Sequence, residues 1–153
     1  MDVFFYWKDF SDDLKPDQIG WFKSHGDKLA ELQDGAPDYL WVFKTPKGLK
    51  GQVQLMARLR WVDTPVVPVP RAPGESRVFY DPGHADSVRY LNGGEAPALA
   101  VATDWVRRYF PVAVRSNFQG ANGQHALRGP AVQELNKLAK TLASEPFLVT
   151  RPA

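Results

Sequence analysis

The clearest hydrophobic pattern in the chain is an alternation of apolar and polar residues over Gln52–Val62. One parity holds only apolar side chains: Val53, Leu55, Ala57, Leu59 and Trp61. The other parity holds Gln52, Gln54, Arg58 and Arg60, with Met56 and Val62 as apolar exceptions. Because successive side chains of a β-strand point to opposite faces, the pattern predicts a long strand with one core face and one mostly polar face.

A second strand is predicted just upstream, at Tyr39–Thr45, which is rich in aromatic and β-branched residues. The segment between the two strands contains the proline and glycine residues typical of turns. Together the two strands predict a β-hairpin whose tip presents Lys47 and Lys50. A basic tip on a sheet with a polar face favours a binding surface over a catalytic centre.

Shorter apolar segments separated by turn residues predict the remaining elements. Further strands are expected at Val3–Trp7, Ser76–Tyr80 and Leu99–Thr103. Helices are expected at Asp17–Phe22, Asp27–Gln33, Trp105–Phe110 and Ala131–Ala143. The last of these has its leucines on one arc at 100° per residue, so we expect it to pack across the sheet. Extended, irregular structure is expected at Asp63–Pro73, and a hairpin-like loop with an Asn-Gly turn signal at Ser116–Pro130. Ala85–Leu91 fits either a helix or a strand.

Composition predicts one globular domain over residues 1–153. The net charge is only +2, although residues 71–153 hold ten Lys and Arg against seven Asp and Glu, a balance compatible with a polyanionic partner. The absence of cysteine excludes disulfides and Cys-ligated zinc. No apolar run approaches the roughly 20 residues of a membrane span, and no signal-peptide pattern opens the chain, so a cytoplasmic protein without membrane contact is expected.

Sequence motifs typical of enzymes are absent, including the phosphate-binding Gly-Lys-Ser/Thr loop, the nucleophile-elbow serine and the paired-histidine zinc helix. The best candidate for chemistry is the group Asp81, His84 and Asp86, which offers two carboxylates and an imidazole within six residues. Such a group could bind a divalent metal or supply an acid–base pair. The alternative is a turn, because Asp-Pro-Gly is a common turn sequence. No cofactor is predicted.

The segment Ser116–Arg128 is the best candidate for recognition. Its amide side chains are suited to hydrogen bonds with the edges of nucleic-acid bases: Asn117, Gln119, Asn122 and Gln124. Arg115 and Arg128 flank these amides and could contact phosphate. The alternative is a loop that is polar only because it is exposed to solvent.

Basic and aromatic residues outside that segment add two further candidates. Arg58 and Arg60 share the polar parity of the long strand, and with Arg77 on a neighbouring strand they could form a basic stripe for phosphates. The alternative is a solvated face with cross-strand ion pairs. Trp61 is assigned to the core, whereas Trp7 lies where a strand ends, and a rim position there would suit stacking on a planar ligand.

The order of these segments resembles the PUA-like superfamily, in particular the EVE and YTH domains. The segments that resemble the family are Val-Phe-Phe-Tyr-Trp, Tyr-Leu-Trp-Val-Phe-Lys, Gly-Gln-Val-Gln-Leu-Met-Ala-Arg-Leu-Arg, Ser-Arg-Val-Phe-Tyr-Asp-Pro and Asn-Phe-Gln-Gly before the last helix. The resemblance implies an α+β fold: a bent, barrel-like, mostly antiparallel sheet with helices packed outside. Members of the family often bind RNA or a flipped, modified DNA base in an aromatic pocket, and the resemblance implies Trp7 as a pocket aromatic. The prolines of residues 63–73 depart from the family pattern.

We therefore expect a non-catalytic nucleic-acid-binding module that recognises a modified or flipped base. DNA is expected rather than RNA, in a restriction or DNA-defence setting with a nuclease domain or subunit as partner. Two alternatives stay open: a small metal-dependent hydrolase or nuclease that uses Asp81, His84 and Asp86, and a protein–protein interaction module.

Overall fold

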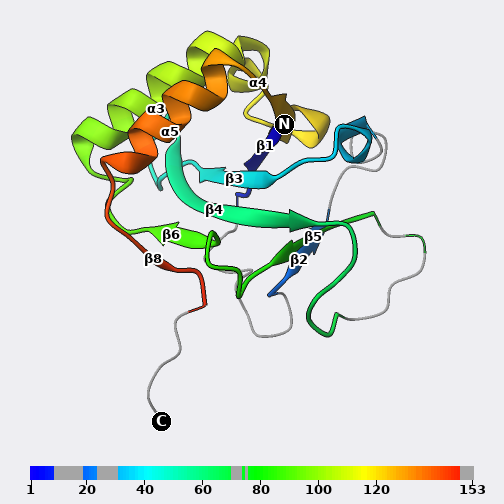
Figure 1. Cartoon of the computed structure of the whole chain (residues 1–153). Helices are drawn as coiled ribbons and strands as arrows, with labels where there is room; N and C mark the ends of the chain where they lie inside the picture. Colours follow the sequence, from blue (N-terminus) through cyan, green and yellow to red (C-terminus); the bar gives the residue numbers. More distant parts are fainter. Residues whose placement is uncertain (9–18, 24–30, 70–73, 75, 149–153) are drawn as a thin grey trace.

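The fold is described from a computed structural model, in which residues 1–8, 19–23, 31–69, 74 and 76–148 are described. It combines α and β structure: one sheet curls into a half-barrel, and two helices, α3 and α5, lie side by side on one face of it (Figure 1). This agrees with the predicted α+β fold of a bent sheet with helices outside. All described strand pairs are antiparallel except β1 with β3.

The strands are β1 Asp2–Tyr6, β2 Trp21–Lys23, β3 Tyr39–Lys44, β4 Gln54–Val62, β5 Arg77–Asp81, β6 Val88–Tyr90, β7 Gln124–Leu127 and β8 Ser144–Pro146. The helices are α3 Ala96–Tyr109, α4 Pro111–Arg115 and α5 Pro130–Lys140, with a 3-10 turn η2 at Gly120–Gly123. The sheet order is β2-β5-β4-β3-β1-β7, and β6 pairs with both β4 and β8. Among the described helices, none has the length and apolar character needed to cross a membrane.

The predicted hairpin is confirmed, because β3 and β4 pair antiparallel and flank the turn. A β-bulge in this pair changes the meaning of the alternating pattern. Val42 pairs with Ala57 and the next residue, Phe43, pairs with Leu55, so Met56 is the extra residue. Burial alternates along all of β4, yet Leu55 and Ala57 face opposite sides of the sheet. The expected single core face is therefore wrong: the apolar parity of β4 serves two cores.

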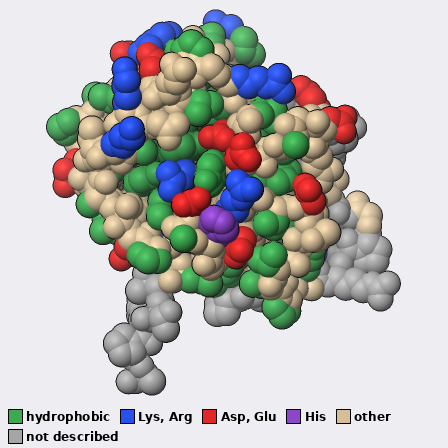
Figure 2. Space-filling model, viewed as in Figure 1, with side chains coloured by type: hydrophobic (Ala, Val, Ile, Leu, Met, Phe, Trp, Pro, Cys, Tyr) green, Lys and Arg blue, Asp and Glu red, His purple; other side chains and the backbone are tan. Residues whose placement is uncertain are grey.

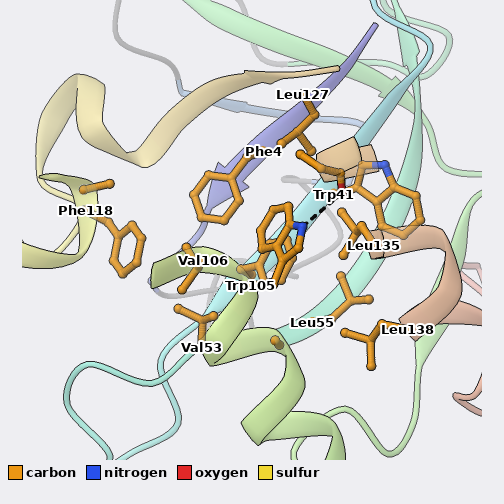
Figure 3. Close-up of a cluster of buried hydrophobic side chains, with 14 of the residues drawn as sticks. Phe4, Trp41, Val53, Leu55, Trp105, Val106, Phe118, Leu127, Leu135 and Leu138 are labelled. Carbon is orange, nitrogen blue, oxygen red and sulfur yellow. Dashed lines mark hydrogen bonds between the residues drawn. The ribbon is translucent and has the colours of Figure 1, made fainter. Parts of the chain in front are cut away.

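Each face of the sheet buries its own hydrophobic cluster. On the face away from α3 and α5, β4 contributes Ala57, Leu59 and Trp61. On the helix face, Leu55 packs among residues of the sheet, α3 and α5, and Figure 3 shows this cluster around Phe4 and Trp105. Both clusters consist of large apolar side chains taken out of water, which is the main source of stability in a domain of this size.

The segment Leu99–Thr103 is helical, so the strand predicted there is wrong. It forms one continuous helix, α3, with the predicted helix Trp105–Phe110. The buried residues Leu99, Ala102 and Val106 recur at helical spacing, and a proline stands in the first turn. The buried Thr103 satisfies its hydroxyl group by accepting a hydrogen bond from the Val53 amide (3.1 Å).

Several other predicted elements can be compared with the structure. The strands at Val3–Trp7 and Ser76–Tyr80 and the helix at Ala131–Ala143 are confirmed as β1, β5 and α5, with small changes at their ends. Residues 88–90 are a strand. Trp21 and Phe22 belong to β2 rather than to a helix, and residues 19–20 of that predicted helix form a turn. Residues 17–18 lie outside the described residues.

In the segment Ser116–Pro130, the turn signal Asn122-Gly123 falls in η2, as expected, whereas the strand β7 was not predicted. β7 pairs antiparallel with β1, placing Gln124 opposite Phe5 and Leu127 opposite Asp2. Its residues do not alternate in polarity, so the strand has no sequence signature. Residues 63–69 form neither helix nor strand, as expected, and residues 31–34 are helical, as expected from the predicted helix at Asp27–Gln33.

Candidate functional site

A cavity of about 620 Å³ lies where the β3–β4 hairpin tip meets the segment after α4. We call it the lysine pocket, and its lining residues are Tyr6, Lys8, Lys44, Thr45, Pro46, Lys47, Gly48, Lys50, Gly51, Asn117 and Phe118. Four of these residues are lysines, and none of them is acidic. The described wall of the cavity is therefore strongly positive, and none of the described residues that line it would repel an anion.

The hairpin tip is a compact turn that exposes its lysines. The amide of Leu49 donates to the Pro46 carbonyl and the amide of Gln52 donates to the Leu49 carbonyl, both at 3.0 Å. Gly48 has a φ of 80°, a left-handed conformation that favours glycine. This turn leaves Lys47 and Lys50 exposed on one side of the cavity.

The opposite wall of the cavity is built by an unusual turn after α4. Asn117 and Phe118 have φ values of 55° and 57°, and a bulky residue such as Phe is rarely found in this region. The turn is closed by the Phe118 amide, which donates to the Ala113 carbonyl at 2.9 Å. It brings the Phe118 ring onto the ring of Tyr6, with centroids 4.4 Å apart and planes at 12°. Backbone strain of this kind persists only where surrounding contacts enforce it.

A second cavity of about 490 Å³ adjoins the first. We call it the amide pocket, and it is lined by Tyr6, Lys8, Asn117, Phe118, Gln119, Gly123 and Gln124. Four of these residues also line the lysine pocket, so the two cavities meet along Tyr6 and Phe118. The structure thus gathers five of the predicted binding residues at one place: Lys47, Lys50, Asn117, Gln119 and Gln124.

Trp7 is buried in the core on the sheet face away from α3 and α5, so the rim position predicted for it is wrong. Its side chain is only 5% exposed and packs against Phe22 at 4.8 Å. Tyr6 is the aromatic residue that lines both cavities, and its hydroxyl donates to the Thr45 hydroxyl at 2.8 Å. The signal was present in the sequence, because Trp7 shares the parity of Val3 and Phe5 in β1, whereas Tyr6 shares that of Phe4.

Arg58 and Arg60 lie together on the helix face of β4, four and six residues after the first residue of the strand, Gln54. We call this pair the arginine stripe. Both guanidinium groups lie over the ring of Tyr39, at 5.2 Å and 5.5 Å from its centroid. Arg58 also donates from Nε to the Asp86 carbonyl (3.1 Å), and Arg60 forms an ion pair with Asp38 (3.4 Å). Figure 2 shows blue and red side chains next to one another around a purple histidine on the face that it draws.

The electrostatics of the arginine stripe centre on a short hydrogen bond between Tyr39 and Asp86. The Tyr39 hydroxyl donates to Oδ2 of Asp86 at 2.6 Å. This bond is the main reason that the pKa of Asp86 lies below, and the pKa of Tyr39 above, its ordinary value. The positive charges of Arg58 and Arg60 also lower the pKa of Asp86. Asp86 is therefore ionised at neutral pH, and its negative charge lies beside the arginine stripe.

Besides Trp7, Arg58 and Arg60, three further predicted binding residues do not line the two cavities. Arg128 follows β7 at the end opposite to Gln124, and its guanidinium lies 3.1 Å from the Met1 sulfur. Arg77 lies on β5 four residues from Asp81, the partner of Arg60, and stacks on Trp21 at 4.1 Å. It therefore does not extend the arginine stripe. Asn122 belongs to η2, where its carbonyl accepts a hydrogen bond from His125 Nε2 (2.8 Å).

The residues Asp81, His84 and Asp86 hold a turn together. Oδ1 of Asp81 accepts the Gly83 amide, and Nδ1 of His84 accepts the Asp86 amide, both at 3.0 Å. Nδ1 of His84 also lies 3.9 Å from Oδ2 of Asp86. Within the described residues, histidines and carboxylates form no group of three or more that could hold a metal ion.

Comparisons of this chain with protein-family models, curated proteins and solved structures gave no match. Function is therefore inferred from the contacts and chemistry of the two adjoining cavities.

Proposed function

We propose that this protein binds nucleic acid through the lysine pocket and has no catalytic activity there. The observation that supports the proposal is the convergence of Lys8, Lys44, Lys47 and Lys50 on one cavity whose described lining contains no carboxylate. Lysine ammonium groups bind phosphate as point charges, and phosphate contacts dominate the affinity of proteins for nucleic acids.

The shape and lining of the cavity also favour this function. Its volume of about 620 Å³ falls within the range of about 300–1,000 Å³ that is typical of ligand sites. Tyr6 and Phe118 add an aromatic wall, and aromatic rings beside a basic groove are typical of proteins that bind nucleic acids. Arg107 lies at the rim, where its guanidinium donates to the Gly51 carbonyl at 3.3 Å.

The curled sheet with external helices is compatible with a PUA-like domain, and we retain that family as part of the proposal. The expectation of DNA rather than RNA and of a modified or flipped base belongs to the same proposal. The alternatives of a metal-dependent hydrolase and of a protein–protein module gain no specific support from the cavities.

The experiment is a fluorescence anisotropy titration with a labelled 12-nucleotide single strand, in DNA and RNA forms, from 50 mM to 1 M salt. Three or four phosphate contacts predict a slope of log affinity against log salt between about −2 and −3. The triple variant Lys8→Gln, Lys47→Gln, Lys50→Gln should reduce this slope by about 2.

The control is a triple variant that removes the same charge elsewhere: Arg60→Gln, Arg77→Gln, Arg128→Gln. Thermal unfolding of both variants verifies that they are folded. If neither strand binds at 50 mM salt, or if the control lowers the slope as much as the lysine variant, the proposed function is wrong.

A further inference from the structure

The two adjoining cavities are lined by different kinds of polar side chain. The lysine pocket is lined by four cations, whereas the described lining of the amide pocket has three carboxamides and one charged residue, Lys8. A ligand that fills both must therefore have an anionic part at one end and a neutral, hydrogen-bonding part at the other. A nucleotide has this arrangement, because its phosphate is anionic and its base is neutral and rich in donors and acceptors.

A column of aromatic rings ends at the junction of the two cavities. Phe4 is fully buried, and its ring centroid lies 5.8 Å from that of Phe118, which is 6% exposed. Phe118 stacks in turn on Tyr6, the outermost ring, which is only partly buried and lines both cavities. A planar base placed against this wall would extend the column, and base–aromatic stacking stabilises binding to any base.

The amide pocket has a tightly built wall. A Cβ atom added to Gly123 would lie 2.9 Å from the Phe118 carbonyl oxygen and 3.6 Å from Cβ of Tyr6, so only glycine fits there. The left-handed turn at Asn117 and Phe118 keeps Asn117 and Gln119 exposed at the cavity while Phe118 stays buried. Carboxamides offer both a donor and an acceptor, the pair needed to contact the edge of a base.

We propose that the joined cavities hold one unpaired nucleotide of a single strand, with its phosphate in the lysine pocket and its base in the amide pocket. Asn117 and Gln119 then contact the base edge and determine specificity. The nucleotide is unpaired because amides at this position need the edge that base pairing would occupy. This inference rests on the proposed nucleic-acid binding, and it adds the base contact and the residues that make it.

The test compares two single-stranded 12-mers at 50 mM salt, one of ordinary DNA and one with abasic residues throughout. Both strands present the same phosphates, so their affinity ratio isolates the contribution of the bases. We expect the ordinary strand to bind about tenfold more tightly. The variant Asn117→Gly, Gln119→Ala should reduce this ratio to about twofold without changing the salt slope. Glycine is chosen at Asn117 because it tolerates a φ of 55°.

The control variant is Gln133→Ala, an exposed glutamine on α5, which should leave the ratio unchanged. Equal binding of the two strands by the natural protein, or an unchanged ratio in the amide variant, overturns this inference, whereas a lysine-dependent salt slope would keep the proposed function. A duplex that binds as tightly as the strand would refute the unpaired nucleotide. A nucleoside monophosphate that binds as tightly would identify a free nucleotide, not a strand, as the ligand. Failure of both strands to bind would refute the proposed function as well.

Discussion

The lysine pocket and the arginine stripe are both basic, but the arginines have partners within the protein whereas the lysines of the hairpin tip face a cavity. In the arginine stripe, Arg60 pairs with Asp38, and the guanidinium of Arg58 lies between the carbonyl of Asp86 and two aromatic rings. In the lysine pocket, Lys47 and Lys50 are exposed beside a cavity whose described lining holds no carboxylate. The same residue class thus stabilises the fold in one region and is available to a ligand in the other.

The surroundings of a cation, and not its presence, therefore distinguish a binding residue from a structural one. Guanidinium groups stack on aromatic faces and bond to carbonyls in fixed geometry, whereas ammonium groups on flexible stems remain hydrated until a ligand arrives. Replacing cations in each region, or the carboxylates beside the arginines, tests this difference.

The largest expected effect is on stability, in the variant Arg58→Ala. This change removes the contacts with the rings of Tyr39 and Trp41 and the hydrogen bond to the Asp86 carbonyl. We expect the free energy of unfolding to fall by about 2 kcal/mol. Denaturant titration gives the value, and Lys50→Ala, expected within about 0.5 kcal/mol of the natural protein, is the control. Equal effects of the two variants would contradict the structural role of the stripe.

The next effect is on binding, in the matched single variants Lys50→Gln and Arg60→Gln. Each removes one positive charge. At 50 mM salt the loss of one phosphate contact to a single strand corresponds to roughly eightfold in affinity, which we expect for Lys50→Gln. Arg60→Gln should change affinity by less than about twofold, because Asp38 already neutralises this arginine. An equal loss in both would show that the whole basic surface, not the pocket, attracts the strand.

A smaller effect, a gain in affinity for the strand, is expected when the carboxylates beside the arginines are neutralised. The variant Asp38→Asn, Asp86→Asn keeps an oxygen that can accept the Tyr39 hydroxyl but removes both negative charges. Affinity for the strand at low salt should rise about threefold, as freed arginines attract phosphate. The gain should persist when Lys50→Gln is added, since distant sites act independently. Unchanged affinity would mean that the carboxylates are not what keeps the stripe inactive.

The smallest effect concerns pH, in the variant Tyr39→Phe. The lowered pKa of Asp86 gives stability above pH 3.8 that is lost as the pH falls through the folded-state pKa. The raised pKa of Tyr39 gives stability below pH 10 that is lost as the pH rises through its folded-state pKa. The stability difference between natural protein and variant should therefore be constant from about pH 4 to 10 and shrink outside that window. Urea titrations at several pH values measure it, and a difference that stays constant across all pH values would contradict the coupling.

Local periodicity determined the parts of this protein that depend on neighbours in sequence. The alternation over residues 52–62 predicted β4, the proline and glycine residues predicted its hairpin, and the leucines of residues 131–143 predicted α5. The amides of residues 117–124 and the lysines of the hairpin tip were predicted as binding residues by their chemistry alone. Spacing also contained a signal for α3, in Leu99, Ala102 and Val106, that was outweighed by local β-branched residues.

The face on which each side chain lies, and the contacts between segments far apart in the chain, depend on how the strands pair and pack. The bulge at Met56 divides the apolar residues of β4 between two cores, and the strand β1 turns Tyr6 to the cavities but Trp7 to the opposite core. The hairpin tip reaches the 117–124 segment because β1 pairs with β3 on one side and β7 on the other. These pairings join segments far apart in the chain, and their free energy comes from buried surface that no local pattern encodes.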